Sequence, residues 1–380
     1  MRTLFKIIIA GAILAFFIGA IGAGFAVWTI LEQRAYLAEL QRQQNIAATL
    51  DLHHVELPFF VPVDGDEVSA ATIDFEFMGQ THSIRPEVNY RVYHGAVALD
   101  RNRLWNSLWQ ELGFDDTQIF AAYYNFLTLE PQMNHAVESV LVQLRAIRDE
   151  RNLTNDEYIE LIVRYVQSFP YCYVHGNIDN PPWMMGCPRM PIQVLVDGTG
   201  DCDETSMLLA VLLYREGYAV SLLNFEEEQH MVLGLGVEGE GFENTGYAFV
   251  ETTSLIYISE VPEMLEGDIV IESVPEVLVI GSRPIENQQA YFSAEALAEI
   301  ERIIDVRERA EAAADEKFRF IERTPMSLAE FNRQVALYEI TFVAMNEFRS
   351  TSYEEGGKCD GIFMDRACAI EWINANAWWE

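Results

Sequence analysis

Lysine is almost absent from this sequence, which contains only Lys6, Lys317 and Lys358. Lysine and arginine together number 25 against 59 acidic residues, so the net charge is −34. A surface of this sign repels nucleic acids and anionic lipid headgroups, and we therefore expect no nucleic-acid partner. The acidity is typical either of a well-solvated surface without a partner or of adaptation to salt or to a cationic partner.

Histidine and cysteine are also scarce, at 7 and 5 residues. Four histidines lie in one N-terminal stretch without ligand-like spacing to any cysteine: His53, His54, His82 and His94. A zinc site built from Cys172, His175 and Cys187 lacks a close Cys-x-x-Cys pair, so we expect no metal centre. The acidic run 226–228 is an alternative calcium ligand set, although adjacent carboxylates in a loop are usually only solvated.

Long uncharged runs are missing except for one, from Ile7 to Leu31, about 25 residues long. As a helix it is long enough to cross a bilayer, and Arg2 and Lys6 before it favour a cytoplasmic N-terminus with the rest of the chain outside the cytoplasm. A cleaved signal peptide ending near the small residues 24–26 is the alternative. The sequence predicts a single-pass membrane protein.

Small residues recur at every fourth position of this run: Gly11, Ala15, Gly19 and Ala23. They share one helix face and could form the seam of a homo-oligomer, although small residues are also common in single spans. Helix-forming residues 32–50 continue as a juxtamembrane helix.

The following region mixes strand and helix patterns. Alternating runs predict strands over 55–63, 72–78 and 88–92, and helical periodicity follows over 102–112, 132–152 and 155–168. We therefore predict an α+β fold, with an anchor (1–31), a juxtamembrane helix (32–50), a main domain (51–265) and a C-terminal region (266–380).

The run Gly198–Glu204, Gly-Thr-Gly-Asp-Cys-Asp-Glu, leads directly into an apolar helical stretch over 205–215. Cys202 then lies where a glycine turn meets the first turn of a helix, and the helix dipole and the unpaired backbone N–H groups there favour a thiolate. His230 opens a strand-like run, and Glu251 follows another at 247–250. These residues predict a nucleophile, its base and the group that orients the base.

The same residues resemble the transglutaminase-like superfamily of papain-like thiol enzymes, and in particular its archaeal and bacterial membrane-tethered members. The resemblance covers about residues 75–262 and rests on 191–195, the Cys202 motif, a helix ending at Gly217-Tyr218, His230 and Val250-Glu251-Thr252-Thr253. It implies a Cys-bearing helix packed on an antiparallel sheet and reaction through a thioester.

The resemblance also implies a side-chain donor for the oxyanion hole, which it places at Gln167, although the sequence alone does not distinguish Gln167 from Gln193. The chain departs from the family at Glu251, where Asp is usual. Glu243 and Asn244 are therefore alternatives for the orienting residue.

The loop from Pro170 to Pro191 is rich in proline and precedes the nucleophile. Trp183 and Met184 offer either an apolar wall to a substrate cleft or a plug for the core. Cysteine spacing favours two disulfides, Cys172 with Cys187 and Cys359 with Cys368, which suit an oxidising exterior and leave Cys202 alone.

Beyond residue 262 the sequence predicts two strands (269–271 and 277–280) and a helical hairpin (293–323 and 327–348), followed by a tail with Trp372, Trp378 and Trp379. Two functions compete. The first is a membrane-anchored thiol hydrolase or acyltransferase acting on peptide or protein amides, with no cofactor. The alternative is a catalytically silent domain serving as a membrane-tethered scaffold.

Overall fold

The computed structural model describes residues 60–110, 116–172, 188–237, 239–265, 269–281, 291–324, 326–347, 353–354, 357–358 and 365–375. The expected membrane anchor, its small-residue seam and the juxtamembrane helix lie outside these ranges. Within them, no helix has both the length and the apolar character needed to cross a membrane.

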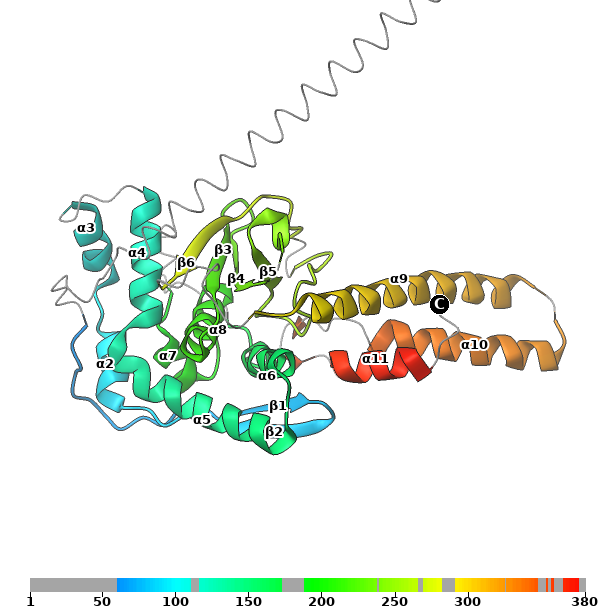
Figure 1. The fold of residues 1–380 in the computed structure, drawn as a ribbon, viewed down its shortest axis with the longest axis horizontal. Coiled ribbons are helices and arrows are strands. Elements are labelled where there is room, and N and C mark those ends of the chain that lie inside the picture. The colour runs from blue at the N-terminus through cyan, green and yellow to red at the C-terminus, as the bar shows by residue number, and fades with distance from the viewer. Residues whose placement is uncertain are drawn as a thin grey trace, which may run out of the picture.

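The fold is α+β, and a four-stranded antiparallel sheet lies at its centre (Figure 1). The strands are β3 (Val220–Phe225), β4 (His230–Gly236), β5 (Tyr247–Val250) and β6 (Glu276–Ile280), in the order β5-β4-β3-β6. The sequence predicts β4, β5 and β6 as strands, and β4 and β5 begin at the predicted residues. Alternate side chains point to opposite faces, so Leu222 and Leu233 join the main core while Leu223 and Val232 join a smaller second cluster.

Helix α8 (Cys202–Glu216) packs against the sheet on β3 and β4 and forms the middle of the main core. Its residues from Glu204 to Leu213 are all buried, among them Met207, Leu208, Val211 and Leu212. Because this part of the helix is buried on every side, other helices enclose it together with the sheet. This enclosure fixes the residue at its start.

The surrounding helices are α4 (Asp116–Leu129), α5 (Asn134–Arg151), α6 (Asn155–Gln167) and α7 (Pro191–Asp197), with a short 3-10 turn at Pro131–Met133 before α5. Helix α6 begins with a capping box of Thr154 and Glu157 and also packs on β1 (Ile73–Phe77), which pairs with β2 (Gln80–Ile84). The sequence did not predict α4 and α7. In α4 the continuous apolar run hides any amphipathic period.

The predicted strand over 88–92 was wrong. Residues 88–92 contribute to helix α2 (Tyr90–Val97), which Asn89 caps by accepting a hydrogen bond from the Arg91 backbone. Local capping therefore overrides the apparent alternation. Helix α3 (Arg101–Gln110) lies near its predicted place, and residues 60–63 of the predicted strand 55–63 are irregular.

The central sheet extends beyond residue 265, where we had placed the end of the main domain, because β6 pairs with β3. The predicted strand 269–271 is absent from the described structure apart from one isolated bridge between Leu265 and Ile269. A short 3-10 turn, Phe242–Asn244, connects β4 and β5.

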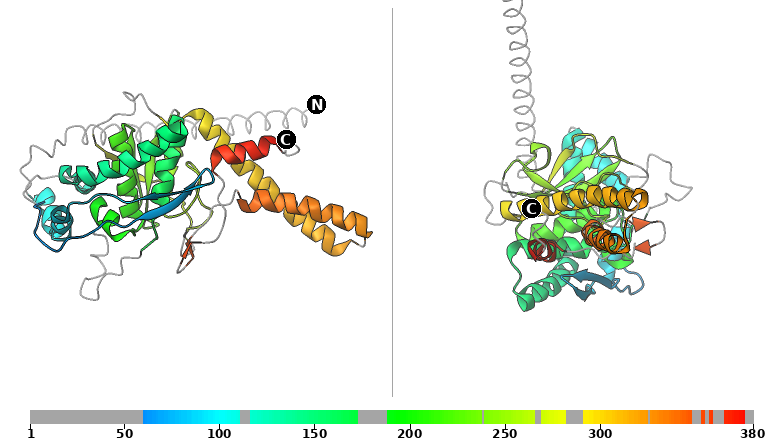
Figure 2. Two further views of the ribbon diagram at one scale, coloured as in Figure 1. Left: turned by 90° about the horizontal axis from the view of Figure 1, so that it is seen from below. Right: turned by 90° about the vertical axis from the view of Figure 1, so that its right-hand side faces the viewer.

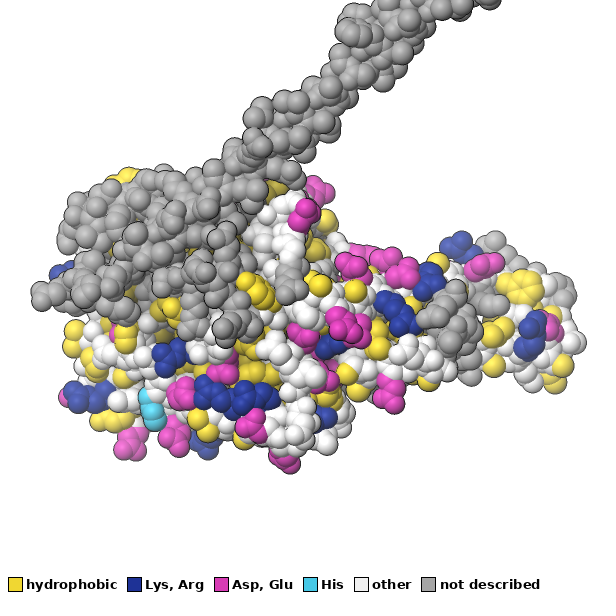
Figure 3. Space-filling model, in the orientation of Figure 1, with side chains coloured by type: hydrophobic (Ala, Val, Ile, Leu, Met, Phe, Trp, Pro, Cys, Tyr) yellow, Lys and Arg dark blue, Asp and Glu magenta, His cyan; other side chains and the backbone are white. Residues whose placement is uncertain are grey.

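The predicted helical hairpin is present as α9 (Ala294–Arg323), capped by Ser293, and α10 (Leu328–Glu347) (Figures 1 and 2). The first turns of α9 are buried against the main body, whereas the outer part pairs with α10 and projects away from it. Hydrophobic side chains are exposed at its outer end, among them Phe318 and Leu328 (Figure 3).

The tail returns to the body. A small pair of strands, β7 (Tyr353–Glu354) and β8 (Gly357–Lys358), precedes α11 (Arg366–Ala375), which packs on α9. Arg366 forms ion pairs with Glu160 of α6 and with Glu299 of α9. These contacts fix the base of the hairpin to the helical layer. Trp378 and Trp379 lie outside the described residues.

Candidate active site at the start of helix α8

Cys202 is the first residue of α8, as predicted, and a tight turn of the chain precedes it. Gly198 ends α7 in the left-handed conformation, with φ of 71°, and its N–H donates to the Val194 carbonyl oxygen at 2.8 Å. Asp201 then caps α8, accepting a hydrogen bond from the Glu204 N–H at 3.1 Å, while the Glu204 carboxylate accepts from the Asp201 N–H at 3.2 Å. This capping box fixes the backbone on both sides of the thiol.

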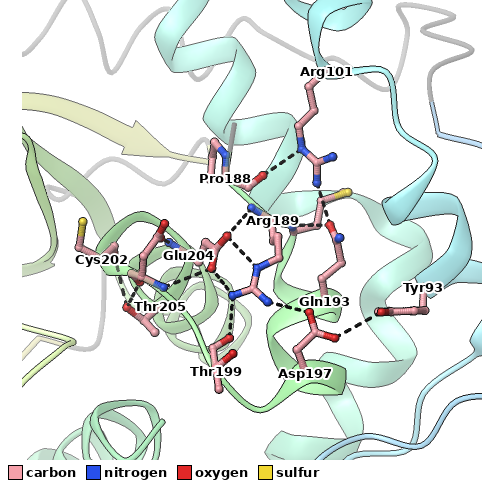
Figure 4. Close-up of polar contacts among 12 residues, drawn as sticks. Tyr93, Arg101, Pro188, Arg189, Gln193, Asp197, Thr199, Cys202, Glu204 and Thr205 are labelled. Carbon is pink, nitrogen blue, oxygen red and sulfur yellow. Dashed lines mark hydrogen bonds and ion pairs between the residues drawn. The ribbon is translucent and has the colours of Figure 1, made fainter. Parts of the chain in front are cut away.

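Arg189 holds the capping box from the side facing away from the thiol (Figure 4). Its guanidinium donates to both oxygens of the fully buried Glu204 carboxylate, at 2.9 and 2.6 Å, and its backbone N–H donates to the same group at 2.9 Å. It also pairs with Asp197 at 2.7 Å and donates to the Thr199 carbonyl at 3.0 Å. Arg189 therefore connects the end of α7, the glycine turn and the start of α8.

His230 and Glu251 meet on neighbouring strands of the sheet. His230 opens β4, Glu251 follows β5 directly, and the His230 Nε2 atom lies 2.8 Å from the Glu251 Oε2 atom. The other oxygen of Glu251 accepts from the N–H groups of Thr252 and Thr253 and from the Thr253 hydroxyl. The extra methylene of glutamate therefore still allows the contact with the imidazole.

Hydroxyl groups tie these three elements together. The Thr252 hydroxyl, next to Glu251, lies 2.8 Å from the Thr205 hydroxyl and 3.2 Å from the Ser206 hydroxyl, both on α8. Ser206 also donates to the Met231 carbonyl on β4 at 3.2 Å. Since all three hydroxyl-bearing residues are buried, the relative position of Cys202, His230 and Glu251 is fixed by a closed network.

The Cys202 thiol is partly buried, and the backbone of Met231, the residue after His230, acts on it and lowers its pKa. The thiol donates to the Asp203 Oδ1 atom at 3.6 Å. Burial, followed by the negative charges of Asp203 and Asp201, raises the pKa of Cys202 well above its ordinary value, and the Met231 contact offsets this only in part. The expected thiolate-favouring effect of the helix start is therefore outweighed by burial and by the neighbouring carboxylates.

The pKa values of His230 and Glu251 move apart. Burial alone lowers the pKa of His230, but the Glu251 carboxylate more than offsets this and the net pKa is raised. Burial would raise the pKa of Glu251, yet His230 and the Thr253 hydrogen bonds lower it. Glu251 therefore stabilises the imidazolium form and fixes the ring through Nε2, and in the neutral form of the ring Nδ1 is the nitrogen that can take a proton from the thiol.

Other predicted site residues have different surroundings. The amide nitrogen of Gln167 donates to the backbone carbonyls of Glu251 and Ile256 at 2.9 and 3.1 Å, so both of its protons serve the loop after β5 rather than an oxyanion. The alternative, Gln193, accepts from Arg101 and from the Met190 N–H. The alternatives Glu243 and Asn244 lie in the 3-10 turn, whereas Glu251 contacts the imidazole.

Several predictions fall where the structure gives no description. Trp183, Met184 and His175 lie outside the described residues. Cys202 and Cys368 are free thiols, whereas Cys187 and Cys359 lie outside the described ranges, so the two disulfides stay predictions. Glu228 of the acidic run accepts from the backbone N–H groups of 272 and 273 and from the Ser273 hydroxyl. In the described part of the chain no group of carboxylates, histidines and cysteines is arranged to hold a metal ion.

Sequence reasoning missed four contributors, Tyr124, Arg189, Asp203 and Thr252. The Tyr124 hydroxyl donates to the Asp203 Oδ2 atom at 3.1 Å, from a helix far away in the chain. Only the capping box left a local signal, because Asp201 and Glu204 have the spacing that such a box requires.

Comparison of the chain with protein-family models, with curated proteins and with solved structures finds no match.

Proposed function

We propose that this chain is a thiol-dependent hydrolase or acyltransferase of the transglutaminase-like type, acting on peptide or protein amides through a thioester. The observation that carries the proposal is the 2.8 Å contact between His230 and Glu251, next to a thiol at the start of a buried helix. An anchor formed by residues 7–31, which would hold the domain outside the cytoplasm, belongs to the same proposal and rests on sequence alone.

Each residue has a defined chemical task in this reaction. Neutral His230 takes the proton from the Cys202 sulfur, and the thiolate attacks the amide carbonyl. Imidazolium then gives that proton to the departing amine, which leaves an acyl group on sulfur. Water or a second amine attacks this thioester and restores the thiol. Glu251 keeps the ring oriented and stabilises its charge during both steps.

The proposal is tested by the Cys202→Ala variant, with Cys368→Ala as the matched control because Cys368 is a partly buried thiol on α11. The assay follows ammonia release and amine incorporation with a casein digest as acyl donor and a labelled primary amine as acceptor. We expect Cys202→Ala to abolish both signals and Cys368→Ala to retain them. His230→Gln should lower turnover by roughly 10²–10⁴-fold, the usual contribution of general acid–base catalysis.

Full turnover by Cys202→Ala would rule the proposal out. Ammonia release without amine incorporation would assign hydrolysis, and ammonia release together with amine incorporation would assign acyl transfer, because ammonia leaves when the thioester forms in both reactions. Trapping the acyl group on Cys202 by acid quench and mass spectrometry gives a second readout that does not depend on the final acceptor.

A catalytically silent scaffold is the second candidate, and one observation favours it. Burial and three carboxylates, Asp203, Asp201 and Glu251, raise the pKa of the Cys202 thiol, which is unusual for a nucleophile. A scaffold predicts no acyl group on Cys202 after incubation with the casein digest at any pH from 6 to 10. An acyl adduct that appears at alkaline pH excludes it.

A further inference from the structure

The Asp203 carboxylate is held at both of its oxygen atoms by uncharged groups. The Cys202 thiol donates to Oδ1 at 3.6 Å, and the Tyr124 hydroxyl donates to Oδ2 at 3.1 Å. Tyr124 lies on α4, which packs against α8, and is itself buried, so its hydroxyl has a fixed position. One oxygen of Asp203 is thereby directed to the sulfur.

The charged groups facing the thiol come from three elements. Asp201 and Asp203 lie on α8 and its cap, His230 opens β4, and Glu251 follows β5. Asp201 caps the helix and Glu251 pairs with the imidazole, so both carboxylates have partners of their own. Asp203 differs because the thiol is one of its two hydrogen-bond partners in the described structure.

We propose that Asp203, oriented by Tyr124, is a positioning residue that keeps Cys202 as a neutral thiol in the resting site. The inference rests on the proposed function, since it describes how the same nucleophile is regulated. The thiol proton stays on sulfur while it is donated to Oδ1, and the reaction starts when that proton moves to the neutral His230 ring. A neutral thiol reacts slowly with alkylating agents and oxidants, so the contact protects the nucleophile between turnovers.

The two hydrogen bonds of the same carboxylate support this role. A carboxylate free to rotate would turn toward water, but the Tyr124 hydroxyl prevents this by binding the second oxygen. Burial raises the pKa of Asp203, and the Tyr124 and Cys202 hydrogen bonds oppose the rise because they stabilise the ionised form.

The test measures the rate of iodoacetamide alkylation of Cys202 between pH 6 and 10, by mass spectrometry of the tryptic peptide, in the full chain and in Asp203→Asn and Tyr124→Phe. Cys368 in the same molecules is the internal reference. We expect Asp203→Asn to raise the Cys202 rate at pH 7 roughly tenfold and to move its pH profile to lower pH, because fewer negative charges then face the thiolate. Tyr124→Phe should act in the same direction but less strongly.

An unchanged or slower Cys202 rate in Asp203→Asn, with the Cys368 rate unchanged, would overturn the inference, and a slower rate would indicate that Asp203 helps to remove the proton. If Asp203→Asn fails to fold, Tyr124→Phe gives the decision by the same criterion. This result is separate from that of the casein assay. Loss of turnover in Cys202→Ala together with an unchanged alkylation rate in Asp203→Asn would refute the role of Asp203 but not the proposed activity. Full turnover in Cys202→Ala together with faster alkylation in Asp203→Asn would refute the proposed activity but not the role of Asp203.

Discussion

Asp203 and Glu204 are neighbours in the chain, yet they lie on two sides of α8 where their carboxylates have different partners. On the Arg189 side, the fully buried Glu204 is neutralised by a guanidinium bound to both of its oxygens. On the thiol side, Asp203 is partly buried and has hydrogen bonds from a hydroxyl and a thiol. The first arrangement anchors the helix, whereas the second leaves a net charge that acts on its reactive neighbour.

The largest effect should come from breaking the Arg189 side. Arg189→Met leaves the Glu204 carboxylate buried without its cation, and we expect the free energy of unfolding to fall by about 3–5 kcal/mol. Urea unfolding followed by circular dichroism measures the change. Arg319→Met is the matched control, since its ion pair with Asp315 is exposed at both ends and its loss should cost about 0.5 kcal/mol or less. Equal losses in the two variants would contradict an anchoring role for Arg189.

Much of this site was predictable from the chain, because its reactive residues follow local rules. Cys202 comes after a glycine turn and before an apolar helix, and His230 and Glu251 lie at strand ends marked by apolar runs. Strands β4 and β5 and the hairpin helices α9 and α10 follow from the same periodicity. These elements depend on short-range patterns, which a sequence displays directly.

The groups that tune the thiol were not predictable, because their contacts join distant segments. Tyr124 reaches Asp203 from a helix whose continuous apolar run shows no period, and Arg189 reaches Glu204 from the end of a proline-rich loop. The role of Gln167 was transferred by resemblance and differs in the structure, where its amide binds two backbone carbonyls. The predicted boundary at residue 265 leaves β6 outside the main domain, because the sequence does not display the long-range pairing of β6 with β3.

We expect an effect of intermediate size on folding stability from the ion pair between His230 and Glu251. His230 has a raised pKa in the folded chain, so its contribution is complete below its ordinary value of 6.5 and is lost as pH rises. Glu251 has a lowered pKa, so its contribution is complete above 4.5 and is lost as pH falls. The pair therefore stabilises the fold most between these two values.

Glu251→Gln should remove roughly 1.5–3 kcal/mol within that window and progressively less on either side of it, because a hydrogen bond between charged groups contributes about this much. Urea unfolding at a series of pH values from 4 to 9 gives the difference from the unsubstituted chain. Glu243→Gln makes the same chemical change at an exposed position and should show no such window. A difference that does not vary with pH would argue against an ion pair between His230 and Glu251.

The smallest effect on stability should come from Asp203→Asn, although it is one residue away from the buried Glu204. A carboxyl group whose pKa is raised by folding holds its proton more tightly in the folded chain, so the unsubstituted protein loses stability as pH rises above 3.8 through the folded pKa. Asparagine removes this loss while its side-chain oxygen can still accept from Tyr124. The variant should therefore stay within about 1 kcal/mol of the parent at pH 7 and gain on it as pH rises from 3 to 7. A loss as large as that of Arg189→Met, measured by the same unfolding series, would mean that both sides of α8 are anchors, and the distinction between a structural and a chemical carboxylate would fail.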